Sequence, residues 1–134
     1  MLFRSTLTGT NTYTGDVKIN GGSLDFLMNG TNKNLNVGKV SGSGDLVLRL
    51  ASGNGDTKIP SIVNDGFTGS ISLVQEGAAS SNKLNSNGQS FEGFKIKVNP
   101  GTSIYINSGE FKPAISISGN GNSETAAHCG SRAR

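Results

Sequence analysis

Short runs in which apolar and polar residues alternate recur along most of the chain. Ile96 and Val98 fall in one phase of such a run, while Lys95 and Lys97 fall in the other. A period of two residues is the signature of a β-strand with one buried face. No long window shows an apolar stripe with a period near 3.6 residues, so the pattern predicts an all-β chain almost without helices. We predict strands at 3–8, 16–20, 23–27, 34–40, 45–50, 58–63, 70–74, 93–98, 103–107 and 114–118.

Glycine and asparagine punctuate these runs. Turn sequences lie at 20–22, 29–30, 42–44, 64–66, 87–88 and 99–101. Both residue types tolerate the left-handed and turn conformations that sharp corners require. Such turns also close antiparallel hairpins, so on their own they leave a sandwich or a barrel open.

Internal repetition favours a solenoid over those alternatives. Segments 13–19 and 67–73 share the order aromatic, Thr, Gly, any residue, aliphatic, polar, aliphatic. Segments 19–24 and 98–104 share an aliphatic residue and Asn, a glycine-containing turn, and then Ser and an aliphatic residue. At three strands per coil, ten strands give about three to four coils, whose stacking buries a narrow core. The side chains predicted to point inward are Ile19, Leu24, Leu46, Leu48, Ile71, Leu73, Ile96, Val98, Ile104, Ile106, Ile115 and Ile117.

Composition agrees with this architecture. A chain of 134 residues forms at most one domain. With twenty glycines and a hydrophobic content of 33%, the chain has few large apolar residues for a compact globular core. A disordered chain, however, would lack the recurring Ile, Val and Leu runs.

Charge and residue counts exclude several functions. The net charge of +3 comes from scattered basic residues with few aromatics, which argues against nucleic-acid binding. No apolar run is long enough to span a bilayer, so we expect no direct membrane insertion. The single cysteine, Cys129, cannot form an internal disulfide, and beside the only histidine, His128, it supplies too few ligands for a metal site. We therefore expect neither a metal nor any other cofactor.

Three carboxylates invite a catalytic or cation-binding interpretation. Asp25, Asp45 and Asp65 are spaced by 20 residues, and β-helices that cleave glycans group such residues on one face. Their contexts differ, because Asp25 lies in a predicted strand and Asp65 in a turn. Stacked like charges are also unfavourable without a metal. We expect no enzyme and no catalytic residues, and a glycan-binding or glycan-cleaving β-helix of the phage tailspike or polysaccharide lyase type is the alternative.

Other motifs are weaker. Segment 53–56 resembles one calcium-binding nonapeptide, a motif that works in tandem. Segment 42–44 lacks the third glycine and the helix of a phosphate-binding loop. A Ser-His-Asp triad would have to use His128, close to the C-terminal end of the sequence. Tyr13 and Tyr105 could contact sugars from the outer face, although covering a strand edge or corner is the simpler role for both.

One stretch carries a family resemblance. The segment 7–24 resembles the autotransporter-associated β-strand repeat found in passenger domains of type V secreted bacterial proteins. Segments 38–48 and 96–124 resemble further strands of such passengers. Val17 departs from the usual Ser or Thr, a harmless change within a strand. The matching residues are Gly9, Asn11, Thr12, Tyr13, Thr14, Gly15, Ile19, Gly22, Ser23 and Leu24.

The resemblance implies a right-handed parallel β-helix at a bacterial cell surface or outside the cell. It further implies an adhesin or stalk role in a parent protein that contacts host surfaces or glycans. The family also carries a signal peptide and a membrane barrel, and neither pattern is visible here. In place of a signal peptide, Met1–Arg4 leads straight into a polar strand pattern. This suggests a fragment or a truncated reading frame.

The sequence divides into a β-helix segment, 1–124, and a tail, 125–134, in which alternation stops. We expect the tail to be disordered and outside the family pattern. A shifted reading frame and an ordinary disordered terminus are alternative origins for it. A solenoid with neither end capped exposes strand edges and apolar side chains, so we also expect end-to-end self-association.

Overall fold

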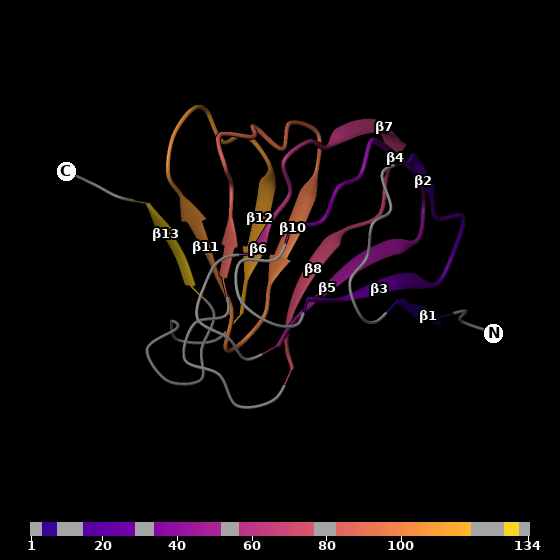
Figure 1. Ribbon diagram of the computed structural model, residues 1–134, viewed down its shortest axis with the longest axis horizontal. Coiled ribbons are helices and arrows are strands. Elements are labelled where there is room, and N and C mark those ends of the chain that lie inside the picture. Colours follow the sequence, from indigo (N-terminus) through magenta and orange to yellow (C-terminus); the bar gives the residue numbers. More distant parts are fainter. Residues whose placement is uncertain are drawn as a thin grey trace.

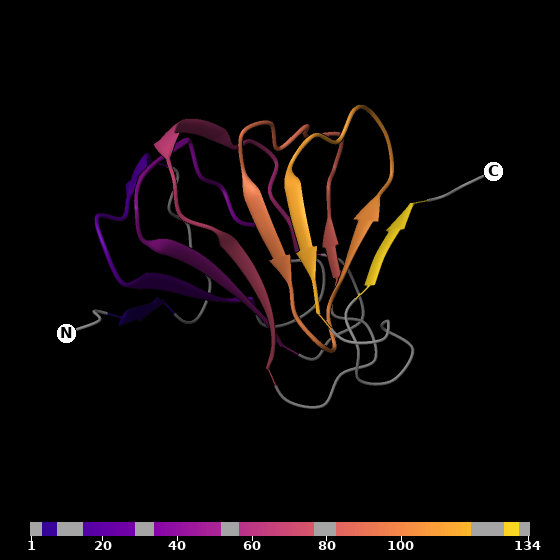
Figure 2. The same ribbon diagram turned by 180° about the vertical axis from the view of Figure 1, so that it is seen from behind.

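The computed structural model describes residues 4–7, 15–28, 34–51, 57–76, 83–118 and 128–131. These residues contain no helix and form a parallel β-solenoid of about four turns, as the alternation and the repeats predict. Figure 1 shows β1, β3, β5, β8, β10 and β12 following one another along the long axis, with β1 near one end of the molecule and β13 near the other, and Figure 2 shows the same arrangement from behind.

Three parallel sheets form the walls of the solenoid. The first sheet runs in the order β1 (Arg4–Leu7), β3 (Ser23–Met28), β5 (Asp45–Ala51), β8 (Ile71–Glu76), β10 (Lys95–Val98) and β12 (Ala114–Ile117). The second contains β2 (Val17–Lys18), β4 (Lys39–Gly42) and β7 (Val63–Phe67). The third contains β6 (Thr57–Lys58), β9 (Lys83–Asn85), β11 (Ser103–Ile106) and β13 (His128–Ser131).

The register of the six-stranded sheet aligns equivalent residues of successive coils into two columns. Because the residues within each column alternate with outward-facing ones, the columns line the interior. The first column consists of Ser5, Leu24, Leu46, Ile71, Ile96 and Ile115. The second column consists of Leu7, Phe26, Leu48, Leu73, Val98 and Ile117.

Aromatic side chains fill part of the interior beyond these columns. The ring centroids of Phe67 and Phe94 are 5.9 Å apart, and those of Phe91 and Phe94 are 6.2 Å apart with the rings edge to face. Phe111 packs on Phe91 at 5.7 Å. Such arrangements are the favoured geometries for aromatic pairs.

Eight of the twelve predicted core side chains are buried: Ile19, Leu46, Leu48, Ile71, Leu73, Ile96, Val98 and Ile104. Leu24 and Ile106 are partly buried and pack against that core. The burial predicted for Ile115 and Ile117 is wrong, since these side chains are 37% and 48% exposed. Their phase is right, because they pair with Ile96 and Val98, but β12 is the last strand of its sheet.

The repeats that indicated a solenoid do not stack on one another. Val17 lies in the three-stranded sheet, while its counterpart in the repeat, Ile71, lies in the six-stranded sheet. Leu24 and Ile104 are likewise in different sheets. In each pair, the matched segments therefore share a corner and the strand that follows it, and they lie at different corners of the coil.

Several strands differ from the prediction. Of the expected strand 34–40, only residues 39–40 lie in a strand, β4, and the expected turn 64–66 lies within β7. The expected strand 58–63 divides into β6 and the start of β7, with Pro60, which lacks an amide hydrogen, between them. β9 was not predicted, since Leu84 is its only apolar residue. β13 pairs with β11 inside the segment expected to be disordered, with Cys129 opposite Ile104. The rest of that segment lies outside the described residues.

Candidate functional site

Among the described residues, four charged side chains form a connected series of ion pairs across four strands of the six-stranded sheet. Arg4, Asp25, Arg49 and Glu76, from β1, β3, β5 and β8, form what we call the ion-pair chain. Asp25 Oδ2 accepts hydrogen bonds from Arg4 Nε at 2.8 Å and from Arg49 Nε at 2.7 Å. Arg49 Nη1 lies 3.3 Å from Glu76 Oε2. The ion-pair chain thus links four successive strands of this sheet.

Asp25 is the buried member of this group, with a side chain only 1% exposed. Its other carboxylate oxygen accepts a hydrogen bond from Ser23 Oγ at 3.0 Å. Burial lowers the pKa of the Arg49 guanidinium, but hydrogen bonds and attraction from Asp25, and then from Glu76, outweigh it and raise that pKa above its ordinary value. Arg49 therefore stays charged, and the arrangement is suited to holding strands together.

The carboxylate ladder considered from the sequence does not form. Opposite Asp45 in the register stands Ser23, two residues before Asp25. Asp45 Oδ1 instead accepts a hydrogen bond from the Ser70 amide at 2.8 Å. Asp65 is exposed on β7, in a different sheet. Among the residues that the structure describes, no three His, Cys, Asp or Glu side chains gather into a possible metal site.

Segment 42–44 is a corner of the solenoid. Gly42 has a φ of +96°, and a Cβ atom there would collide with the Ile19 carbonyl of the preceding coil. The Gly44 amide donates a hydrogen bond to that same carbonyl at 2.8 Å. The glycines therefore allow one corner to stack closely on another, a structural role that sequence alone did not assign.

The remaining sequence candidates are dispersed. Tyr105 is partly buried, and Lys83 Nζ lies 5.4 Å from the centroid of its ring, within range for a cation–π contact. His128 and Cys129 lie next to each other on β13. Tyr13 and segment 53–56 lie outside the described residues.

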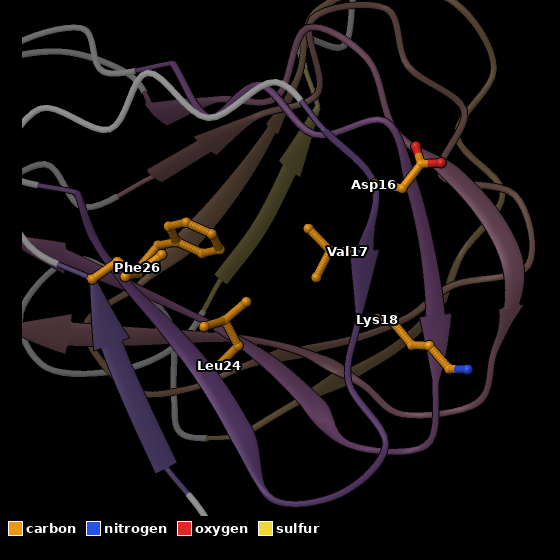
Figure 3. A pocket seen from close by; sticks show the side chains of 6 residues that line it. Asp16, Val17, Lys18, Leu24 and Phe26 are labelled. Atoms are coloured by element: carbon orange, nitrogen blue, oxygen red, sulfur yellow. The ribbon is translucent and has the colours of Figure 1, made fainter.

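A cavity of about 200 Å³ lies at the first coil. Figure 3 shows Val17 pointing toward Leu24 and Phe26, while Asp16 and Lys18 point away from them. The lining therefore combines an apolar interior with a charged rim, and Leu7 of β1 completes it. Sequence reasoning missed this cavity, because it depends on which coil lacks a complete neighbour.

No family model, curated protein or solved structure matches the chain. In the described part of the chain, no helix has the length and apolarity needed to cross a membrane.

Proposed function

We propose that this chain is a non-enzymatic β-helical segment of a bacterial surface passenger, with the role of a stalk. The proposal rests on the resemblance of segment 7–24 to the autotransporter-associated repeat. The observation that carries it is the continuous stacking of both interior columns through all six strands of one sheet. A stalk needs such an uninterrupted column, which can hold another domain away from a surface.

The chemistry of the outer face supports the same proposal. Its side chains are largely short and polar or belong to lysines, as at Ser72, Lys97 and Ser116, which follow one another across three strands. Asp25 is engaged by two arginines, and Asp45 by a backbone amide. Carboxylates held in these contacts strengthen the scaffold, and they are poorly suited to the paired acid–base work of glycan cleavage.

Surface display tests the proposal. The chain is fused between an N-terminal epitope tag and a separate membrane-anchoring barrel, and the tag is measured by flow cytometry before and after mild proteolysis. We expect the tag to be displayed and the folded column to resist the protease. Ile96→Asp buries an unpaired charge and should abolish this resistance. Lys97→Asp, at the adjacent exposed position, is the matched control and should retain it.

Two further measurements separate the stalk from its alternatives. Specific binding of the purified chain to a glycan array or to host cells would contradict the stalk role and support an adhesin role. Release of new reducing ends from a polysaccharide would favour the enzyme. Equal protease sensitivity of the unsubstituted fusion and Ile96→Asp would show that no folded column is displayed.

A further inference from the structure

The exposed large apolar side chains of the described residues all lie on strands at the edge of a sheet. Leu7 is on β1, and Ile115 and Ile117 are on β12, the two outermost strands of the six-stranded sheet. Val63 is on β7, which ends the three-stranded sheet. Apolar exposure is thus concentrated where the stacking of described strands stops.

The two ends of the six-stranded sheet present the same pair of columns. The first column begins at Ser5 and ends at Ile115, and the second begins at Leu7 and ends at Ile117. If β1 of a second copy were added beside β12, Ser5 would follow Ile115 and Leu7 would follow Ile117. Every strand pair in the sheet is parallel, so the added strand continues both the hydrogen-bonding pattern and the apolar columns.

We propose that two copies of this chain bind head to tail, with β1 of one copy pairing in parallel with β12 of the other. Leu7 of the arriving copy then covers Ile117, and the apolar cavity beside Leu7 is closed by the interior of the preceding copy. The contact joins different surfaces of the two molecules, so it leaves a free end on each and extends into a filament. This inference is independent of the proposed surface role.

Electrostatics permit this pairing. In the same register, Arg4 and Thr6 of the arriving strand lie opposite Ala114 and Ser116, which carry no charge. Arg4 is already neutralised by Asp25 of its own chain. The strand that accepts β1 therefore presents no like charge, and the exposed side chains of β12 are small or aliphatic.

Sedimentation velocity over a concentration series tests the proposal, with two variants that each disable one end. Leu7→Lys removes the arriving surface, and Ile117→Lys removes the accepting one. We expect the unsubstituted chain to form species beyond the dimer that grow with concentration. Each variant alone should be monomeric, because an unpaired lysine in the contact weakens it at least about tenfold. Mixed in equal amounts, the two variants should form a dimer and nothing larger, since one intact end remains on each.

Matched controls keep the test specific. Thr6→Lys and Ser116→Lys add the same charge to the same strands on the outward face, and should leave association unchanged. Circular dichroism and melting of every variant should match those of the unsubstituted chain, because all four sites are on terminal strands. Three results would each overturn the proposal: a monomeric unsubstituted chain at the highest soluble concentration, self-association of either end variant alone, or an equimolar mixture that stays monomeric.

Discussion

The central strand β10 and the terminal strand β12 carry the same alternating pattern but bury it to very different extents. Ile96 and Val98 are each 1% exposed, whereas their partners in the next coil, Ile115 and Ile117, are 37% and 48% exposed. Both pairs consist of β-branched aliphatic residues in the same phase of the same sheet. Only the number of neighbouring coils differs, since β10 lies between β8 and β12 while β12 has a described neighbour on one side.

This difference shows that a core residue of a solenoid is defined by the coils above and below it. In a globular domain, the face of a strand decides burial, because other elements cover that face. In this solenoid, the inward side chains of each coil are covered by the side chains of the coils stacked on either side of it. A terminal coil keeps the inward phase and loses the burial.

The two ends also differ from each other. At the first coil, the exposed strand β1 is tied to β3 through Arg4 and the buried Asp25. Near β12, the ion pair between Lys112 and Glu110 is local and exposed on both sides, at 2.6 Å. The first end therefore has an electrostatic tie across strands that the described part of the other end lacks.

The sharpest test of this comparison is to truncate one column at two neighbouring coils. Ile96→Ala should cost about 2–5 kcal/mol in the free energy of unfolding, because it leaves a cavity between two stacked coils. Ile115→Ala removes the same atoms from an exposed position and should cost less than about 1 kcal/mol. Urea unfolding followed by circular dichroism measures both. Equal costs would mean that β12 is covered as fully as β10.

Corners provide a second test of stacked against unstacked positions. Gly42→Ala forces a side chain into a φ of +96° and against the Ile19 carbonyl of the preceding coil, and should cost about 2–3 kcal/mol. Gly21→Ala lies at the corner of the first coil, where a Cβ would meet no atom within 4 Å, and should be close to neutral. Thermal melts compare them directly. A large loss from Gly21→Ala would show that the first corner is also tightly packed.

Sequence predicted the fold well because its main determinants are local. Alternation sets the phase of each strand, so the inward phase of Ile115 was predicted correctly, although its burial was not. The sequence matches that suggested repetition joined corners that do not stack, since Val17 and Ile71 lie in different sheets. Every corner requires a sharp backbone turn, so similar sequences recur at corners that do not stack. Which corners stack depends instead on loop lengths, which vary from coil to coil.

The candidate site was far less predictable. The even spacing of Asp25 and Asp45 suggested a ladder, but the coils are not 20 residues long at that point, and the register offsets these side chains by two positions. The true partners of Asp25 are arginines on the neighbouring strands. Sequence contains the charges, but only the register brings them together.

The ion-pair chain gives the third test, directed at the first coil. Asp25→Ala removes the buried acceptor shared by Arg4 and Arg49, and should destabilise the fold by about 1–3 kcal/mol. Both guanidiniums can then turn toward water, which keeps the loss below that of a truncated core. Asp65→Ala, at an exposed position in the middle of β7, is the matched control and should change the unfolding free energy little. If Asp25→Ala leaves the free energy of unfolding unchanged, the ion pairs of Asp25 contribute nothing to holding β1.

The smallest expected effect separates the two arginines that share Asp25. The Arg4 side chain is 54% exposed on the terminal strand, so Arg4→Ala should cost less than about 1 kcal/mol, as is usual for exposed ion pairs. Arg49 is less exposed and also contacts Glu76, so Arg49→Ala should cost more.

Urea unfolding at low salt and at about 1 M salt, where the screening length falls to about 3 Å, distinguishes the two arginine substitutions further. The Arg4 contribution should shrink with salt more than the Arg49 contribution, because water and ions reach it freely. If Arg4→Ala instead proves as costly as Asp25→Ala at both salt concentrations, β1 is held as firmly as a central strand, and the contrast between stacked and terminal strands fails at this end of the solenoid.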